Sequence, residues 1–284
     1  MNSLNEWEVG ASTAILHYNG GVTKEGFNNY KKSGIEYAEL SLELDDLERL
    51  GFYERPEKIK QLAADSGVKF WSFHIPFGEN INPAILDRQK NKYAMDIMKK
   101  CISQATKIGI ETIVIHPSFE PNDAESRRDK MDCSIENMSI LSKFCKNLGA
   151  VLTAEDLPRT CLGNCSEEII EFLNSVDDLM FCFDTNHVTA QKNEDFLDEL
   201  IKHHFQGRVR TIHVSDYDGI DERHRLPFDG TNNWKEIVSK LKKLEYNGVF
   251  MYEVGKAWDR EKPYTLEAVK QNYLKMKSEI FKTI

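Results

Sequence analysis

The sequence predicts an α/β fold, a single (β/α)8 TIM barrel that spans residues 1–284. Short β-branched or apolar runs alternate with longer amphipathic stretches from end to end, which is the pattern of repeated βα units. Eight such runs in 284 residues give about 35 residues per unit, the size expected for a barrel of this kind. An open doubly wound sheet has the same periodicity and is the alternative at this point.

Eight runs are expected as strands, each four to eight residues long and bounded by polar or turn-forming residues. In chain order they are residues 7–13, 37–42, 69–76, 112–117, 151–156, 180–184, 209–215 and 249–254. In a barrel these strands lie parallel, so all their carboxyl ends meet at one mouth.

Amphipathic patterns between these runs predict helices. The clearest are residues 84–108, 135–148, 234–244 and 264–281. In the first, apolar residues recur at spacings of mostly four: Ile85, Tyr93, Ile97 and Cys101. That spacing is typical of a helix with one buried face. Three glycines follow helical runs and precede strands: Gly67, Gly109 and Gly149. Glycine is favoured there because helices often end in a left-handed residue.

Composition and charge restrict the class of protein. The chain has 37 Lys and Arg against 46 Asp and Glu, a net charge of −9, which argues against generic nucleic-acid binding because phosphate affinity comes mostly from basic residues. No apolar run reaches the ~20 residues of a membrane helix, and the first residues do not form a signal peptide. The six cysteines include no C-x-x-C pair, as in a reducing compartment. We therefore expect a cytoplasmic protein without membrane contact.

Ionisable side chains gather where the predicted strands end. Five histidines and three carboxylates do so: His74, His116, His187, His213 and His224, with Glu155, Asp184 and Glu253. A single histidine in such a position is usually structural, but a barrel directs all of these side chains to one mouth, where barrel active sites lie. Buried carboxylates repel one another unless a cation neutralises them. Glu, Asp, His and Glu around one point suit Mn²⁺, Mg²⁺, Co²⁺ or Zn²⁺, so we predict a metal site.

These residues stand in an order that resembles a known family. The matching motifs are Gly34–Leu40, His74, His116, Ala154-Glu155-Asp156, Asp184-x-x-His187, His213-Val214-Ser215-Asp216, His224 to Gly230, Trp234 and Tyr252-Glu253. Together they resemble the xylose-isomerase-like barrel superfamily over nearly the whole chain. That superfamily holds sugar and sugar phosphate isomerases and epimerases, and also apurinic-site endonucleases.

The resemblance implies one divalent metal ion bound by four residues: Glu155, Asp184, His213 and Glu253. It also implies that Glu155 and Glu253 act as an acid/base pair on opposite faces of a small sugar, sugar phosphate or related polyol. Proton transfer at a carbon next to a carbonyl fits such a pair, because one carboxylate removes the proton and the other returns it. A hydride shift is not excluded. His187, with His74 and His116, is expected to bind the substrate.

Two departures from the family pattern affect this hypothesis. The epimerases carry an arginine six residues after the strand-seven histidine, where this chain has Gly219, so Arg223 or Arg225 is expected to contact the substrate instead. The endonucleases bind three zinc ions and use an Asp-x-His pair, which here is Glu222-Arg223-His224. His74, His116, His187, Glu222 and His224 are therefore additional candidate metal ligands.

Two alternative functions follow from these departures. One is a metal-dependent apurinic-site endonuclease that hydrolyses a phosphodiester; the net charge argues against it, and the lysine pairs lie in amphipathic helices. The other is a sugar-binding barrel without catalysis, since fold alone does not establish activity. The resemblance also makes a homodimer or homotetramer an expectation.

The positions of four aromatic residues near strand ends allow two interpretations. Trp71, Phe73, Phe77 and Trp258 could line a sugar-sized pocket or pack at the barrel rim. The sequence favours neither, and it leaves the identity of the substrate and of the metal open.

Overall fold

A computed structural model describes residues 7–187, 191–255 and 262–283 as a closed parallel barrel. The strands pair in chain order, and β1 closes the ring by pairing with β8. Their bounds are β1 Val9–Ser12, β2 Tyr37–Ser41, β3 Lys69–His74, β4 Thr112–Ile115, β5 Val151–Glu155, β6 Met180–Asp184, β7 Val209–Val214 and β8 Phe250–Tyr252. Each strand falls within its predicted run, so the predicted (β/α)8 fold is confirmed and the open sheet is excluded.

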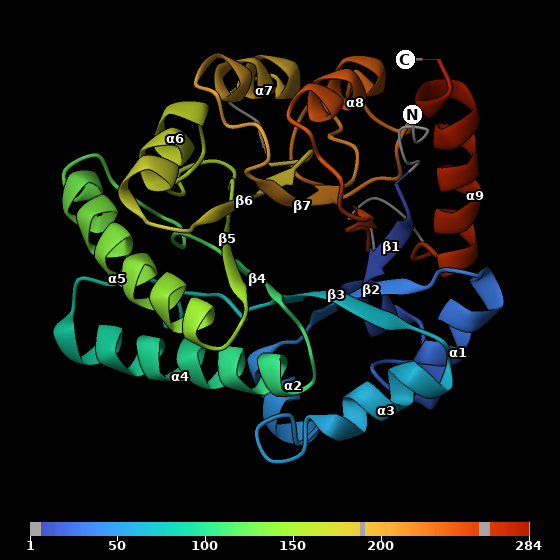
Figure 1. The fold of residues 1–284 in the computed structure, drawn as a ribbon, viewed down its shortest axis with the longest axis horizontal. Helices are drawn as coiled ribbons and strands as arrows, with labels where there is room; N and C mark the ends of the chain where they lie inside the picture. The colour runs from blue at the N-terminus through green and yellow to red at the C-terminus, as the bar shows by residue number, and fades with distance from the viewer. Residues whose placement is uncertain (1–6, 188–190, 256–261, 284) are drawn as a thin grey trace.

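Helices surround the strands on the outside of the ring (Figure 1). The α-helices are α1 Lys24–Ser33, α2 Leu44–Arg49, α3 Glu57–Asp65, α4 Arg88–Lys107, α5 Arg127–Asn147, α6 Ser166–Ser175, α7 Asn193–Lys202, α8 Trp234–Lys243 and α9 Leu266–Met276. A 3-10 turn, η1 Thr13–Tyr18, follows β1, and a π-helical turn, η2 Lys277–Phe281, follows α9. Helix α9, red in Figure 1, packs against α1 and β1. The last helix therefore covers the place where the barrel closes.

Two helices begin more than two residues away from their predicted starts. Helix α4 begins at Arg88 and not at residue 84, because the Asp87 side chain caps it by accepting hydrogen bonds from the Gln89 and Lys90 backbone N–H groups. Helix α5 begins at Arg127, well before residue 135. Its first two turns are mostly charged and carry no apolar repeat, so the hydrophobic pattern does not predict them. The three predicted helix-end glycines, Gly67, Gly109 and Gly149, do adopt positive φ angles.

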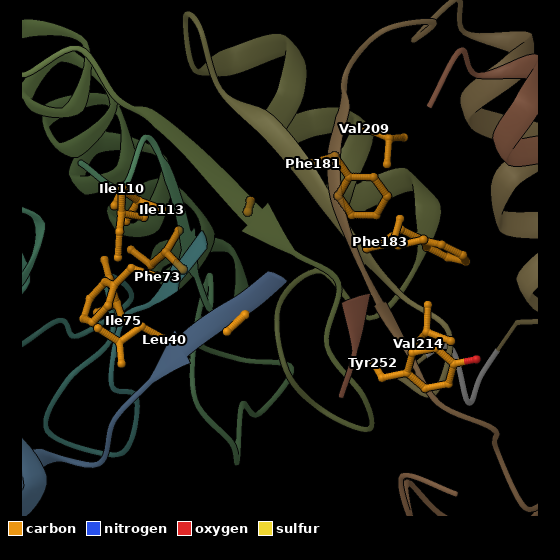
Figure 2. Close-up of a cluster of buried hydrophobic side chains, with 14 of the residues drawn as sticks. Leu40, Phe73, Ile75, Ile110, Ile113, Phe181, Phe183, Val209, Val214 and Tyr252 are labelled. Atoms are coloured by element: carbon orange, nitrogen blue, oxygen red, sulfur yellow. The ribbon is translucent and has the colours of Figure 1, made fainter. Parts of the chain in front are cut away.

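Side chains alternate between the barrel interior and the helices. Phe181 and Phe183 on β6 point outward and stack near Phe196 of α7, and Tyr252 on β8 donates a hydrogen bond to Asn272 of α9. Figure 2 shows two groups of such side chains, one from β2 to β4 and their flanks, the other from β6 to β8. Because a strand repeats every two residues, the residues between these positions point into the barrel.

No helix in the described ranges has both the length and the apolar character needed to cross a bilayer.

Candidate metal centre at the barrel mouth

Four side chains from consecutive strands meet at the carboxyl end of the barrel. They are Glu155 at the end of β5, Asp184 at the end of β6, His213 on β7 and Glu253 just after β8. One ligand atom from each lies within 4.8 Å of the other three. Around His213 Nδ1, the nearest carboxylate oxygens are at 3.0 Å (Glu155), 3.2 Å (Glu253) and 3.8 Å (Asp184). This is the set predicted to bind one divalent metal.

The strand periodicity explains why these four side chains converge. Glu155 pairs in register with Cys182, and Asp184 pairs with His213. Their neighbours in sequence, such as Ala154, Phe183 and Ile212, are fully buried on the other side of the strands. Parallel strands ending at one level therefore place a carboxylate or imidazole on each of four adjacent strands.

The electrostatics of this cluster fit a bound cation. Burial raises the pKa of Asp184 to about 6 although the charge of His187 opposes the rise. The Oδ2 atom of Asp184 is buried without a hydrogen-bond partner. Burial opposes the ionised form of Glu155 as well, but His213 and His116 together hold its pKa well below the usual value. Carboxylates crowded in this way, with one oxygen left unpartnered, suit a divalent ion with oxygen and nitrogen ligands.

Glu155 also joins a second cluster. Its Oε2 atom lies 3.0 Å from His74 Nε2 and 3.3 Å from His116 Nε2. One ligand atom from each of these three residues lies within 4.8 Å of the other two. Burial lowers the pKa of His74, yet the hydrogen bond and charge of Glu155 outweigh it and raise that pKa to about 9. Burial is the dominant effect on His116, whose pKa is lowered.

A third cluster stands at the rim and consists of His187, Glu222 and His224. His187 Nε2 is 3.3 Å from Glu222 Oε2, while its Nδ1 is 3.3 Å from Glu155 Oε1. His224 Nδ1 lies 3.0 Å from the Glu253 carbonyl oxygen. All the additional ligand candidates named from the sequence are thus gathered around the mouth.

The loop between β7 and α8, residues 216–233, carries Glu222 and His224 and is organised by Asp216. The Asp216 carboxylate accepts hydrogen bonds from the backbone N–H groups of Phe228 and Asn232 and from the Trp234 indole. Its backbone also pairs with Arg225. A single buried carboxylate therefore shapes the loop that covers one side of the mouth.

The two arginines expected to contact the substrate have another partner. Arg223 Nε lies 3.1 Å from Asp218 Oδ2, and Arg225 Nη2 lies 3.8 Å from the same oxygen. Neither lines the cavity at the mouth, whereas Arg159 does. Arg159 was not identified from the sequence; it pairs with Glu120 at 2.6 Å and with Asp221 at 3.2 Å.

The cavity has a volume of about 140 Å³ and a mixed polar and apolar lining. Its polar lining residues include Glu155, Glu253, His187, His224 and Glu222, and its apolar ones include Phe77, Phe119, Leu157, Pro158 and Cys161. Phe77 is 47% exposed, and its ring stacks on His116 with the centroids 3.9 Å apart. The volume suits a ligand smaller than the drug-sized molecules that occupy pockets of roughly 300 Å³ and more.

The other aromatic residues named from the sequence lie elsewhere. Phe73 is fully buried and stacks on Phe52. The Trp71 indole donates a hydrogen bond to Thr211 Oγ1, and Trp258 is outside the described residues. Of the four, the structure places Phe77 at the cavity.

One buried carboxylate at the site was not identified as a candidate. Glu39 on β2 is 0% exposed, and its Oε2 atom lies 3.0 Å from His213 Nε2. The signal was present, because Glu39 sits between Ala38 and Leu40 in a predicted strand and so points to the opposite face from both.

Comparison with known proteins adds to this geometry. Residues 27–272 match the model of a family described as the xylose isomerase-like TIM barrel. An uncharacterized protein of Methanocaldococcus jannaschii is 25% identical over 185 residues, which cover 63% of this chain and 62% of that protein. A probable endonuclease 4 of Mycoplasmopsis agalactiae is 24% identical over 209 residues, or 69% of this chain and 70% of the relative. The matched region thus spans less than two thirds of the first relative.

Solved structures share the fold over nearly the full chain. A D-tagatose 3-epimerase-like protein superposes with a TM-score of 0.78 at 21% identity, covering 97% of this chain and 98% of that one. A D-psicose 3-epimerase from Clostridium cellulolyticum H10, solved with D-tagatose, gives a TM-score of 0.75 at 18% identity and covers 96% and 99%. At these identities the similarity establishes the architecture.

Proposed function

This chain belongs to the xylose isomerase-like TIM barrel family, and from that premise we propose that it is a divalent-metal-dependent isomerase or epimerase. Its proposed substrate is a small sugar, sugar phosphate or related polyol. The observation that carries the proposal is the approach of Glu155 and Glu253 to one atom, His213 Nδ1, at 3.0 and 3.2 Å beside the cavity.

Four residues would hold the metal ion: Glu155, Asp184, His213 and Glu253. Three carboxylates and an imidazole are compatible with Mn²⁺, Co²⁺, Mg²⁺ or Zn²⁺. When bound, such an ion acts as a Lewis acid that stabilises negative charge on the carbonyl and hydroxyl oxygens of a substrate. The unpartnered Oδ2 atom of Asp184 supports this assignment.

The two glutamates would perform the proton transfer. Both line the cavity, and they come from β5 and from the residue after β8, so they approach a bound substrate from different sides. One carboxylate takes the proton from the carbon next to the carbonyl, and the other returns a proton to the opposite face, which inverts that carbon. His187, which also lines the cavity, would hydrogen-bond a substrate hydroxyl.

The size and lining of the cavity support a sugar as the substrate. A volume of about 140 Å³ suits a molecule of a few carbon atoms. The apolar lining residues suit the C–H groups of a sugar, and the polar lining residues suit its hydroxyls. Three proteins of the same architecture are described as a D-tagatose 3-epimerase-like protein, a D-psicose 3-epimerase and an L-ribulose 3-epimerase.

Isotope exchange tests the proposal. Metal-loaded protein is incubated in D₂O with a panel of ketoses and ketose phosphates, and deuterium incorporation and isomer formation are followed together, since a hydride shift would give isomers without deuterium. We expect both signals to depend on added Mn²⁺ or Co²⁺ and to disappear in Glu155→Gln. The exposed Glu236→Gln provides a matched control. Absence of exchange and of isomers with every substrate would contradict the proposal.

A second candidate function is metal-dependent phosphodiester hydrolysis, as in an apurinic-site endonuclease. Two observations favour it: the His74, His116 and Glu155 cluster and the His187, Glu222 and His224 cluster adjoin the four-residue site, and one relative is a probable endonuclease 4. The net charge of −9 and the small cavity argue against a duplex substrate.

Metal content and a nicking assay separate the two functions. Three tightly bound ions per chain, a reduced count in His224→Ala and cleavage of a duplex with an abasic site would favour hydrolysis. One ion per chain and intact duplex would favour the isomerase or epimerase.

A cytoplasmic location, a single-domain organisation and a homodimer or homotetramer complete the proposal. Analytical ultracentrifugation of the full chain would determine the subunit number.

A further inference from the structure

We propose that Glu39 is a positioning residue that fixes the orientation and the tautomer of His213. Glu39 lies on β2, far in sequence from His213 on β7, and both side chains are 0% exposed. Glu39 Oε2 is 3.0 Å from His213 Nε2. The other ring nitrogen, Nδ1, faces Glu155, Asp184 and Glu253.

This contact decides which nitrogen carries the hydrogen. A neutral imidazole has one N–H and one lone pair, and an ionised carboxylate can only accept. When His213 Nε2 donates to Glu39, the lone pair on Nδ1 is directed at the three carboxylates that would share the metal ion. Hydrogen bonds of this kind fix the tautomer and ring orientation of metal-binding histidines in general.

Glu39 is itself held in place by the adjacent strand. Ser72 on β3 pairs in register with Glu39, and its hydroxyl donates a 2.8 Å hydrogen bond to the same Oε2 atom. The sequence of contacts is therefore Ser72 to Glu39 to His213, all within the barrel interior. It links the first half of the barrel to the candidate metal centre in the second half.

The burial of Glu39 needs an explanation that packing does not provide. Its partners are the Ser72 hydroxyl and the His213 imidazole, and its Oε1 atom is buried without a hydrogen-bond partner. Burying a carboxylate under these conditions is costly. A positive charge on the His213 ring, or a cation bound at its Nδ1 atom, would offset that cost, because the negative charge of Glu39 acts on it directly or through the imidazole.

The inference rests on the proposed metal centre, so its test uses the metal alone. The affinity for Co²⁺ is measured by competition with a chromophoric chelator, and the visible spectrum of the Co²⁺ complex reports ligand geometry. Glu39→Gln keeps the side-chain shape but can present an amide N–H to Nε2. We expect it to weaken Co²⁺ binding by roughly 10- to 100-fold and to change the Co²⁺ spectrum.

Two further variants complete the experiment. Ser72→Ala removes the hydrogen bond that holds Glu39, and we expect a smaller loss of affinity, roughly threefold. Glu36→Gln makes the same charge change at an exposed position just before β2, where the side chain is 68% exposed, and it should bind Co²⁺ like the wild type. Thermal melts in chelator establish that each variant is folded.

The outcomes distinguish this inference from the proposed function. A folded Glu39→Gln protein with wild-type Co²⁺ affinity and spectrum would overturn the role of Glu39 while leaving the metal centre intact. Two outcomes would overturn both this inference and the proposed metal centre: the wild type binds no Co²⁺, or Glu155→Gln binds Co²⁺ as tightly as the wild type does. If Glu39→Gln does not fold, Ser72→Ala decides: unchanged Co²⁺ affinity in that variant overturns the inference.

Discussion

Glu155 and Glu253 approach the same atom, His213 Nδ1, although their strands β5 and β8 are separated by two others in the barrel. Glu155 is the more deeply placed of the two, with contacts to His74, His116 and His187 as well. Glu253 remains 18% exposed and lies nearer the solvent. The pair is therefore unequal, and its members should respond differently to substitution.

Glu253→Gln should reduce the rate of substrate proton exchange by about 10²- to 10⁴-fold, the usual contribution of a general acid or base. Glu155→Gln should cause a similar loss and also lower the metal content, because Glu155 contacts more of the cluster. Initial rates of deuterium incorporation and metal analysis measure the two effects. Wild-type exchange rates in Glu253→Gln would contradict the acid/base assignment.

Phe77→Ala should raise KM by roughly twofold to tenfold, because aromatic contacts contribute about 0.5–1.5 kcal/mol beyond buried area. Phe77 presents its ring at the cavity and is already 47% exposed, so the melting temperature should change little. Steady-state kinetics and a thermal melt measure both quantities. The matched control is Leu86→Ala, because Leu86 is 49% exposed and does not line the cavity. If the wild type, Phe77→Ala and Leu86→Ala have the same KM, Phe77 does not contact the substrate.

The fold could be predicted in detail because local patterns determine it. Every strand lies within its predicted run, since the alternation of apolar and polar residues is set by the pleat itself. The start of α5 could not be predicted in the same way. Arg127 and Arg128 in its first turn pair with Glu168 and Glu171 of α6, contacts that exist only after the barrel has formed.

The candidate site was predictable as a group of residues and much less as a network. Position at strand ends is a local property, and it identified every member of the three clusters around the mouth except Glu222, which the resemblance to the endonucleases supplied. Which oxygen faces which nitrogen depends on closure of the ring between β1 and β8. The partnership of Glu39 with His213 is a consequence of that closure. The contact of Arg223 with Asp218 is set within the loop between β7 and α8, whose conformation the sequence pattern does not predict.

Asp184→Asn should remove the stabilisation of the fold by divalent metal. For the wild type, Mn²⁺ at 100 times its Kd should add about 2.7 kcal/mol, or roughly 5–10 °C in melting temperature. In EDTA the variant should melt no lower than the wild type, because it loses a buried carboxylate whose pKa burial has raised to about 6. Calorimetry of the wild type and the variant, each with Mn²⁺ and with EDTA, measures these melting temperatures. If Mn²⁺ raises the melting temperature of the variant as much as that of the wild type, Asp184 is not a ligand.

Asp216→Ala should destabilise the chain and loosen the loop over the mouth. The carboxylate accepts three hydrogen bonds, from Phe228, Asn232 and Trp234, and its removal leaves these donors without their acceptor. We expect a loss of about 2–3 kcal/mol in the free energy of unfolding, since each unsatisfied buried group costs about 1–3 kcal/mol and the loop can partly rehydrate. Denaturant unfolding measures that loss, and limited proteolysis should cut within residues 216–233 before the barrel unfolds. The exposed Asp229→Asn in the same loop should behave like the wild type.

Because Glu222 and His224 are carried by this loop, KM should rise in Asp216→Ala. The Co²⁺ affinity of the site formed by Glu155, Asp184, His213 and Glu253 should stay unchanged. A variant that unfolds normally and resists protease would show that Asp216 does not organise the loop.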